Sequence, residues 1–129
     1  YLAENEQDFS NRLDKLMDIA ARSLKTKRTV ITKLMENGLY FQLGKKAVDQ
    51  AMRIRAALME AGFTFHVDSP TNQLFPIFTD EQWEKIEELG FKLEFNGRLD
   101  EEHVCLRVCT SWCTPDEYVD QFIEAVKEL

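Results

Sequence analysis

The chain has 129 residues, 44% hydrophobic and 30% charged, a composition typical of one globular domain rather than a disordered segment. Its net charge of −7 repels nucleic acid, and no apolar run approaches the roughly 20 residues that span a membrane, so we expect neither as a partner. Three cysteines are too few for a disulfide scaffold, and YLAENEQDFS lacks the features of a signal peptide. We therefore expect a cytoplasmic protein.

Residues 5–36 are predicted to form one long helix that Gly38 ends. About 32 residues at 1.5 Å each give roughly 48 Å, longer than a compact domain of this size. Part of the helix should therefore project, bend or pack on another chain, and we favour a homodimer that pairs two such helices. Segment 22–33 has five cations and no acid, and we interpret it as a solvated helix face rather than a binding patch. Its apolar stripe contains Phe9, Leu13, Leu16, Met17, Ala20, Leu24, Ile31, Leu34 and Met35.

The remaining elements alternate between helices and short strands. Pro76 inside a strand indicates an edge strand or a bulge. Thr79 with Gln82, and Thr114 with Glu117, have the spacing of capping boxes, with Pro115 at the first helical position. Glycines 62 and 90 end helices. The predicted helices are 42–61, 80–89 and one that begins after Thr114, and the predicted strands are 63–67, 74–78, 91–95 and 103–109.

The predicted order is α-α-β-β-α-β-β-α. Short connections between successive strands favour hairpins, so the four-stranded sheet should be mainly antiparallel. We predict an α+β two-layer sandwich with helices on one face of the sheet, built as a single domain of residues 1–129. Expected core residues in the helices are Val48, Met52, Ile54, Leu58, Met59, Tyr118, Phe122, Ile123 and Val126, and Phe91, Leu93 and Phe95 should share one strand face.

Cys105, Cys109 and Cys113 are evenly spaced at four. Strong metal signals use CxxC pairs or Cys-x-x-His, and neither pattern occurs. Cys105 and Cys109 in one strand would lie about 13 Å apart, too far to share an ion. We interpret the cysteines as small buried hydrophobes and expect no metal site. His66 and His103 are not placed beside a cysteine, so a catalytic Cys–His pair is not expected.

Arg107 lies within an apolar strand, on the opposite parity to Val104, Leu106 and Val108. A cation at such a position either faces water or presents its planar fork to a carboxylate at the sheet surface. The sequence alone leaves both interpretations open.

From about Asn37 to its end, the sequence resembles the C-terminal small domain of threonine aldolases of the pyridoxal-phosphate β-eliminating lyase group. The matching stretches are NGLYFQLGKKA, VDSPTNQLFPIF and HVCLRVCTSWCTPDEYVD. The resemblance implies an aspartate-aminotransferase type of fold, in which this small domain lies against a large domain that carries the cofactor lysine. It implies that Arg107 holds the α-carboxylate of the substrate, and it gives no role to the loop Ser69–Gln73. Because the motifs of the large domain do not occur in the sequence, we expect no bound cofactor and no catalytic residue.

The stretch LDKLMDIAARSLKTKRTVITKLMENGLY resembles a helical segment of anaerobic ribonucleotide reductases. We therefore interpret the chain as an engineered chimera, a folded structural module without catalytic activity, with residues 1–36 of separate origin from residues 37–129. The alternative is a fragment of a pyridoxal-phosphate-dependent aldolase or lyase that retains weak binding of a carboxylate or of the cofactor.

Overall fold

The computed structural model describes residues 38–129. The first predicted helix, the homodimer predicted through it and the basic segment 22–33 lie outside the described residues. The chain divides after Tyr40, and the sheet belongs to the unit Phe41–Leu129. Within the described part, no helix combines the length and the apolar character needed to cross a bilayer. The elements are α3 (Leu39–Glu60), β1 (Phe65–Val67), β2 (Gln73–Thr79), α4 (Asp80–Glu88), β3 (Glu94–Arg98), β4 (His103–Cys109) and α5 (Asp116–Val126).

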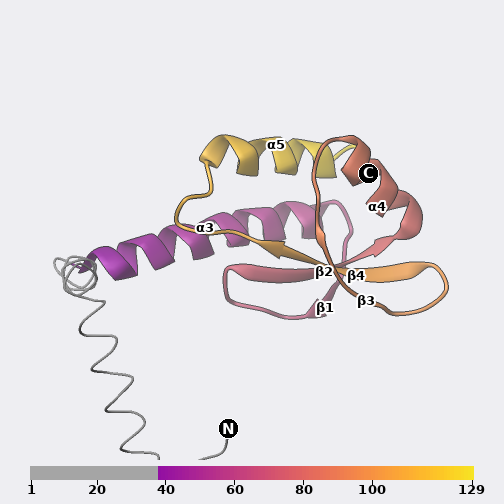
Figure 1. Cartoon of the computed structure of the whole chain (residues 1–129), viewed down its shortest axis with the longest axis horizontal. Coiled ribbons are helices and arrows are strands. Elements are labelled where there is room, and N and C mark those ends of the chain that lie inside the picture. The colour runs from indigo at the N-terminus through magenta and orange to yellow at the C-terminus, as the bar shows by residue number, and fades with distance from the viewer. Residues whose placement is uncertain (1–37) are drawn as a thin grey trace, which may run out of the picture. The chain divides into compact units, whose positions relative to one another are not determined.

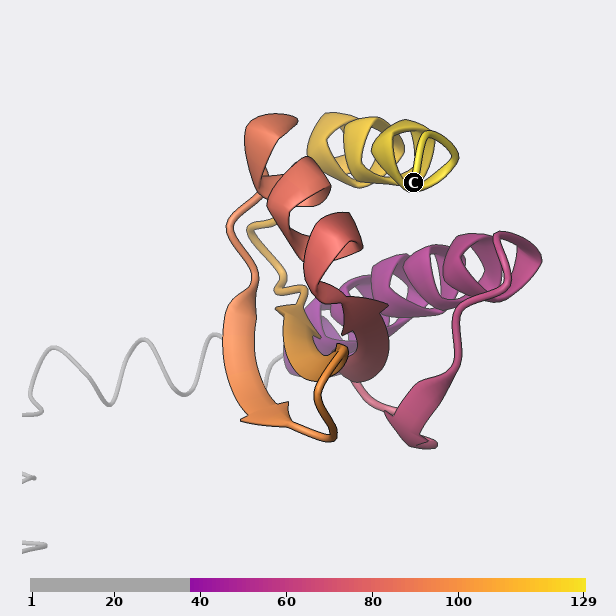
Figure 2. The same ribbon diagram turned by 90° about the vertical axis from the view of Figure 1, so that its right-hand side faces the viewer.

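The four strands form one antiparallel sheet in the order β1-β2-β4-β3. The three described helices lie on one side of it, and α5 runs beside α3 (Figures 1 and 2). The predicted fold class and the predicted order from the second helix onward are confirmed. The strand β2 is interior, so of the two alternatives predicted from Pro76 the edge strand is wrong and the bulge is confirmed. The register of β1 against β2 does shift, between Phe65, which is opposite Pro76, and Val67.

The core forms where α3 and α5 meet the helix-facing side of the sheet. In α3 the buried positions recur at helical spacing, so one stripe of the helix is buried. The predicted core residues Ile54, Leu58, Phe122 and Val126 are buried, but Met59 and Tyr118 are 53% and 59% exposed, and their neighbours take the core positions. The core cluster contains Ala51, Ile54, Leu58, Phe63, Leu74, Phe78, Ile86, Val104, Leu106, Val108, Val119, Phe122, Ala125 and Val126.

The strand predicted over 91–95 begins later, at Glu94. Phe91 and Leu93 precede it and pack against the core, where the Phe91 ring meets Phe122 edge-on at 5.2 Å. Phe95 is half-exposed and stacks on Trp83 with ring centroids 5.7 Å apart. It is therefore less buried than Phe91 and Leu93. The register of β3 against β4 shifts between Phe95 and Gly97.

One predicted cap is confirmed and the other is wrong. Thr79 caps α4, since its hydroxyl accepts from the Gln82 N–H while the Gln82 side chain accepts from the Thr79 N–H. Gly90 ends this segment with a φ of 94°, which a residue without a Cβ adopts readily. For α5 the cap is Pro115, without a side-chain bond. Thr114 cannot cap because its hydroxyl accepts instead from the backbone N–H of Ser111, at 2.8 Å.

The β3–β4 hairpin is held by two carboxylates. Arg98 donates to both oxygens of Asp80, at 3.1 and 2.8 Å. Oδ1 of Asp100 accepts from the backbone N–H groups of Glu102 and His103, at 2.9 and 2.8 Å. His103 Nδ1 lies 2.9 Å from the same oxygen. These hydrogen bonds hold the pKa of Asp100 below its ordinary value, and the bond from the Glu102 N–H has the largest effect.

The lowered pKa of Asp100 predicts an acid-sensitive hairpin. A carboxyl whose pKa is lowered by folding stabilises the fold above its unfolded pKa of about 3.9, and this contribution is lost as the pH falls through the folded value. An Asp100→Asn variant keeps an oxygen acceptor but does not titrate. Urea unfolding midpoints at pH 7 and pH 3 should therefore fall less in the variant than in the wild type. An equal fall in both proteins would contradict this prediction.

Candidate functional site

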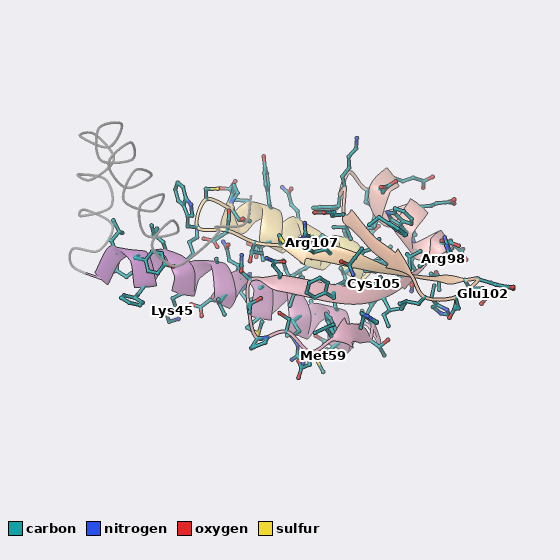
Figure 3. The ribbon with its side chains drawn as sticks, turned by 60° about the horizontal axis from the view of Figure 1, so that its bottom comes forward. Lys45, Met59, Arg98, Glu102, Cys105 and Arg107 are labelled. Carbon is teal, nitrogen blue, oxygen red and sulfur yellow. The ribbon has the colours of Figure 1, made fainter. Side chains whose placement is uncertain are left out.

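Arg107 lies near the end of the interior strand β4, away from the hairpin residues Arg98 and Glu102 (Figure 3). Side chains alternate along β4, so the Arg107 side chain points to the face of the sheet opposite to that of Leu106 and Val108, which belong to the core. This agrees with the prediction from its position in the strand. Its side chain is 34% exposed, and its guanidinium donates through Nη2 to the carboxylate of Glu94. This hydrogen bond raises the pKa of Arg107. The two residues are direct cross-strand partners, so the pair follows from the register of β3 on β4.

Both members of this pair line a cavity of about 640 Å³. Its walls come from α5 and from the segment that joins α4 to β3, and the end of β4 completes it. Most of the lining is apolar, and its charged members are Lys92, Glu94 and Arg107. The volume lies within the range usual for small-molecule sites, about 300–1,000 Å³.

The end of β4 is tied to two other parts of the fold through Thr110, which is 3% exposed. Its hydroxyl donates to the backbone carbonyl of Ala47 in α3, at 2.6 Å. Its backbone N–H donates to the Asn72 carbonyl at 3.0 Å, and the Asn72 side chain returns a bond to the Thr110 carbonyl at 2.7 Å. The loop Ser69–Gln73 therefore has a structural role, because it fixes the strand end that follows Arg107.

The loop after β4 is anchored through Thr114. Its carbonyl accepts from Lys46 at 3.1 Å and from the Gln50 side chain at 3.0 Å. Gln50 also donates to Asp116 at 2.6 Å, which joins α3 to the first turn of α5. Gln50 is 2% exposed, and among residues 38–129 its Oε1 has no hydrogen-bond partner. A water molecule would satisfy this oxygen.

The cysteines divide into two environments. Cys105 is buried, as expected, whereas Cys109 and Cys113 are exposed, so the prediction that all three are buried hydrophobes is wrong for these two. Among residues 38–129 no group of three metal-ligating side chains comes together. His103 bonds to Asp100 rather than to a thiol.

Four residues that position the site were not identified from the sequence: Glu94, Gln50, Asn72 and Thr110. Glu94 can be paired with Arg107 only when the strand register is known, and that register contains a shift. The other three act across 38 to 64 residues of sequence, a distance over which periodicity carries no signal.

No protein-family model matches the chain, and no curated protein matches it significantly. Among solved structures, it is similar to threonine aldolase from Leishmania major, with a TM-score of 0.71 and 29% identity over 74% of this chain. It is also similar to serine palmitoyltransferase from Sphingomonas wittichii, with a TM-score of 0.59 and 19% identity over 78% of this chain, a likeness of fold alone. The chain spans 28% and 26% of the lengths of these two proteins.

These similarities agree with the resemblance to threonine aldolases stated from residues 37–129. Nothing in the comparisons supports the resemblance to ribonucleotide reductases or the interpretation as an engineered chimera. The helix on which that interpretation depends lies outside the described residues. The comparisons favour the alternative, a fragment of a larger enzyme fold, over the structural module without activity.

Because Thr110 joins β4 to α3, removing its hydroxyl should weaken the fold. A Thr110→Val substitution keeps the shape of the side chain and leaves the Ala47 carbonyl without this donor, so we expect a loss of about 1–3 kcal/mol in the free energy of unfolding. Urea denaturation measures this loss. Thr64→Val, at an exposed position, is the matched control and should change stability by less than about 0.5 kcal/mol. Equal losses of unfolding free energy in the two variants would contradict the role of Thr110 in joining β4 to α3.

Proposed function

We propose that this chain acts as the small domain of a pyridoxal-phosphate-dependent enzyme of the threonine aldolase kind. In this function Arg107 binds the carboxylate of the substrate. The observation that carries the proposal is the position of Arg107, a partly exposed side chain on a firmly held strand of a fold similar to the aldolase. The resemblance of HVCLRVCTSWCT to the family motif assigns the carboxylate role to this same arginine.

The chemistry of Arg107 suits this role. A guanidinium presents donors in a planar fork that matches a carboxylate, and two parallel bonds fix the orientation of the bound group. Within the described residues, Glu94 is the side chain that accepts from Arg107, and it uses one nitrogen. The remaining N–H groups are therefore available to a ligand.

Pyridoxal phosphate does not fit the described residues as a bound cofactor. An imine with the cofactor needs a lysine that is shielded from water, but Lys45, Lys85, Lys92 and Lys127 are exposed, and Lys46 donates to the Thr114 carbonyl. We therefore assign no cofactor contact to residues 38–129. The contribution of these residues is limited to the binding and orientation of the carboxylate.

The proposal predicts weak binding of a simple carboxylate at Arg107. Acetate titrated into the ¹⁵N-labelled full chain should shift the Arg107 side-chain signal and the amide signals at the end of β4. Arg107→Gln removes the charged fork and should weaken acetate binding about tenfold or more. Binding constants from the NMR shifts measure the effect.

Arg98→Gln is the matched control, because Arg98 is also a half-exposed arginine in an ion pair, with Asp80, at the other end of the sheet. It should leave acetate binding unchanged. Acetate that binds Arg98 as well as Arg107, or that binds Arg107→Gln as tightly as the wild type, would count against a specific carboxylate site.

A further inference from the structure

Asn96 is an extra residue in the strand β3. Phe95 is opposite Leu106 of β4, and Gly97 is opposite Cys105. Between these pairs β3 advances by two residues and β4 by one, so Asn96 has no opposite residue in β4. The strand order places β3 at an edge of the sheet that residues 38–129 form. Because the hydrogen-bond ladder is disrupted at such a bulge, Asn96 is held less firmly than a residue inside a regular strand.

The Asn96 side chain is exposed and weakly bound. Its amide nitrogen donates to the Cys105 sulfur at 3.5 Å, and a thiol is a weak acceptor. The other asparagine among residues 38–129, Asn72, is partly buried, and its amide nitrogen donates to the Thr110 carbonyl at 2.7 Å. The Asn96 side chain is therefore the freer of the two to rotate toward the backbone that follows it.

The residue that follows, Gly97, leaves its backbone nitrogen accessible. Glycine has no Cβ, so this nitrogen is not shielded from the preceding side chain. The fold itself does not require glycine here, because a Cβ at Gly97 would meet no atom within 4 Å and its φ is not positive. An alanine at this position would therefore fit, which makes Gly97→Ala a usable control.

We propose that Asn96 is a site of spontaneous deamidation in the folded protein. Asparagine is among the chemically labile side chains. The Gly97 backbone nitrogen forms a bond to Cγ of Asn96, while the bond from Cγ to the side-chain nitrogen breaks. That nitrogen leaves as ammonia and takes the proton of the Gly97 amide. A water molecule then opens the cyclic imide at either of its two carbonyl carbons, which gives aspartate or isoaspartate.

This reaction alters the strand that pairs Glu94 with Arg107, whether or not the proposed function holds. Isoaspartate adds one main-chain atom to β3 two residues after Glu94, so the register against β4 is disturbed. Either product adds a negative charge beside the Cys105 thiol, which is 1% exposed. A carboxylate has no N–H to donate to that sulfur, so the bond from Asn96 is lost. We expect the converted protein to be less stable.

Ageing the full chain at pH 6 and pH 9 tests the proposal. Peptide mass mapping should show conversion at Asn96 that is faster at pH 9, because the Gly97 nitrogen must lose its proton to attack. Conversion makes the net charge of −7 one unit more negative, so anion exchange separates the product. The separated product should have a lower urea unfolding midpoint than the unconverted protein.

Gly97→Ala should slow conversion at Asn96 about tenfold or more, because its Cβ hinders the attack. Its urea midpoint shows whether the variant is folded. Asn72, which is followed by Gln73, should stay unconverted. An equal rate in Gly97→Ala and in the wild type, or a rate independent of pH, would overturn the proposed attack by the Gly97 nitrogen.

A parallel sample in urea decides whether the folded protein reacts. If the bulge leaves Asn96 free, its conversion in native buffer should be within about tenfold of the rate in urea, since weakly held segments open at little cost. Conversion in urea alone would show that β3 protects Asn96 and would overturn the proposal. The sequence contains the same dipeptide at Asn37–Gly38. Conversion of that pair in native buffer while Asn96 stays intact would overturn it as well.

Discussion

The arrangement around Arg107 depends on the hydrogen bonds of Thr110. A strand end that leads into a loop is usually free to move, but here one residue is bonded to a helix carbonyl and to a neighbouring loop in both directions. Removing any of these bonds would let the last residues of β4 shift against α3. Arg107 lies three residues before Thr110 in the chain, so the backbone that carries its side chain is held by contacts that never touch the guanidinium.

The fold was predictable where the signals are local. The capping box of Thr79 and the stop at Gly90 depend on neighbours within four residues, and both are confirmed. Thr114 has the same sequence signal as Thr79 but does not cap, because the backbone of Ser111 competes for its hydroxyl. Tyr118 was assigned to the core from its apolar ring, yet its neighbour Val119 takes the buried position.

The site was predictable only in part, for a similar reason. Strand alternation was enough to separate Arg107 from the core residues beside it. The partner of Arg107 could not be predicted in this way, because Glu94 lies opposite Arg107 through a strand register that a bulge modifies. The cavity depends on Phe91 and Leu93 packing before the strand begins, which alternation alone misassigned to the strand itself. Long-range pairing, rather than residue type, is what a single sequence leaves undetermined.

The two edges of the sheet have a consequence for how the molecule behaves in concentrated solution. The strand β1 has three residues and an irregular register against β2, and β3 combines a register shift with the charged side chains of Glu94 and Arg98. Short, bulged and charged edges are poor templates for the backbone of another chain. An open four-stranded sheet of this kind is therefore protected against edge-to-edge growth into fibrils, although neither edge is covered by a described helix.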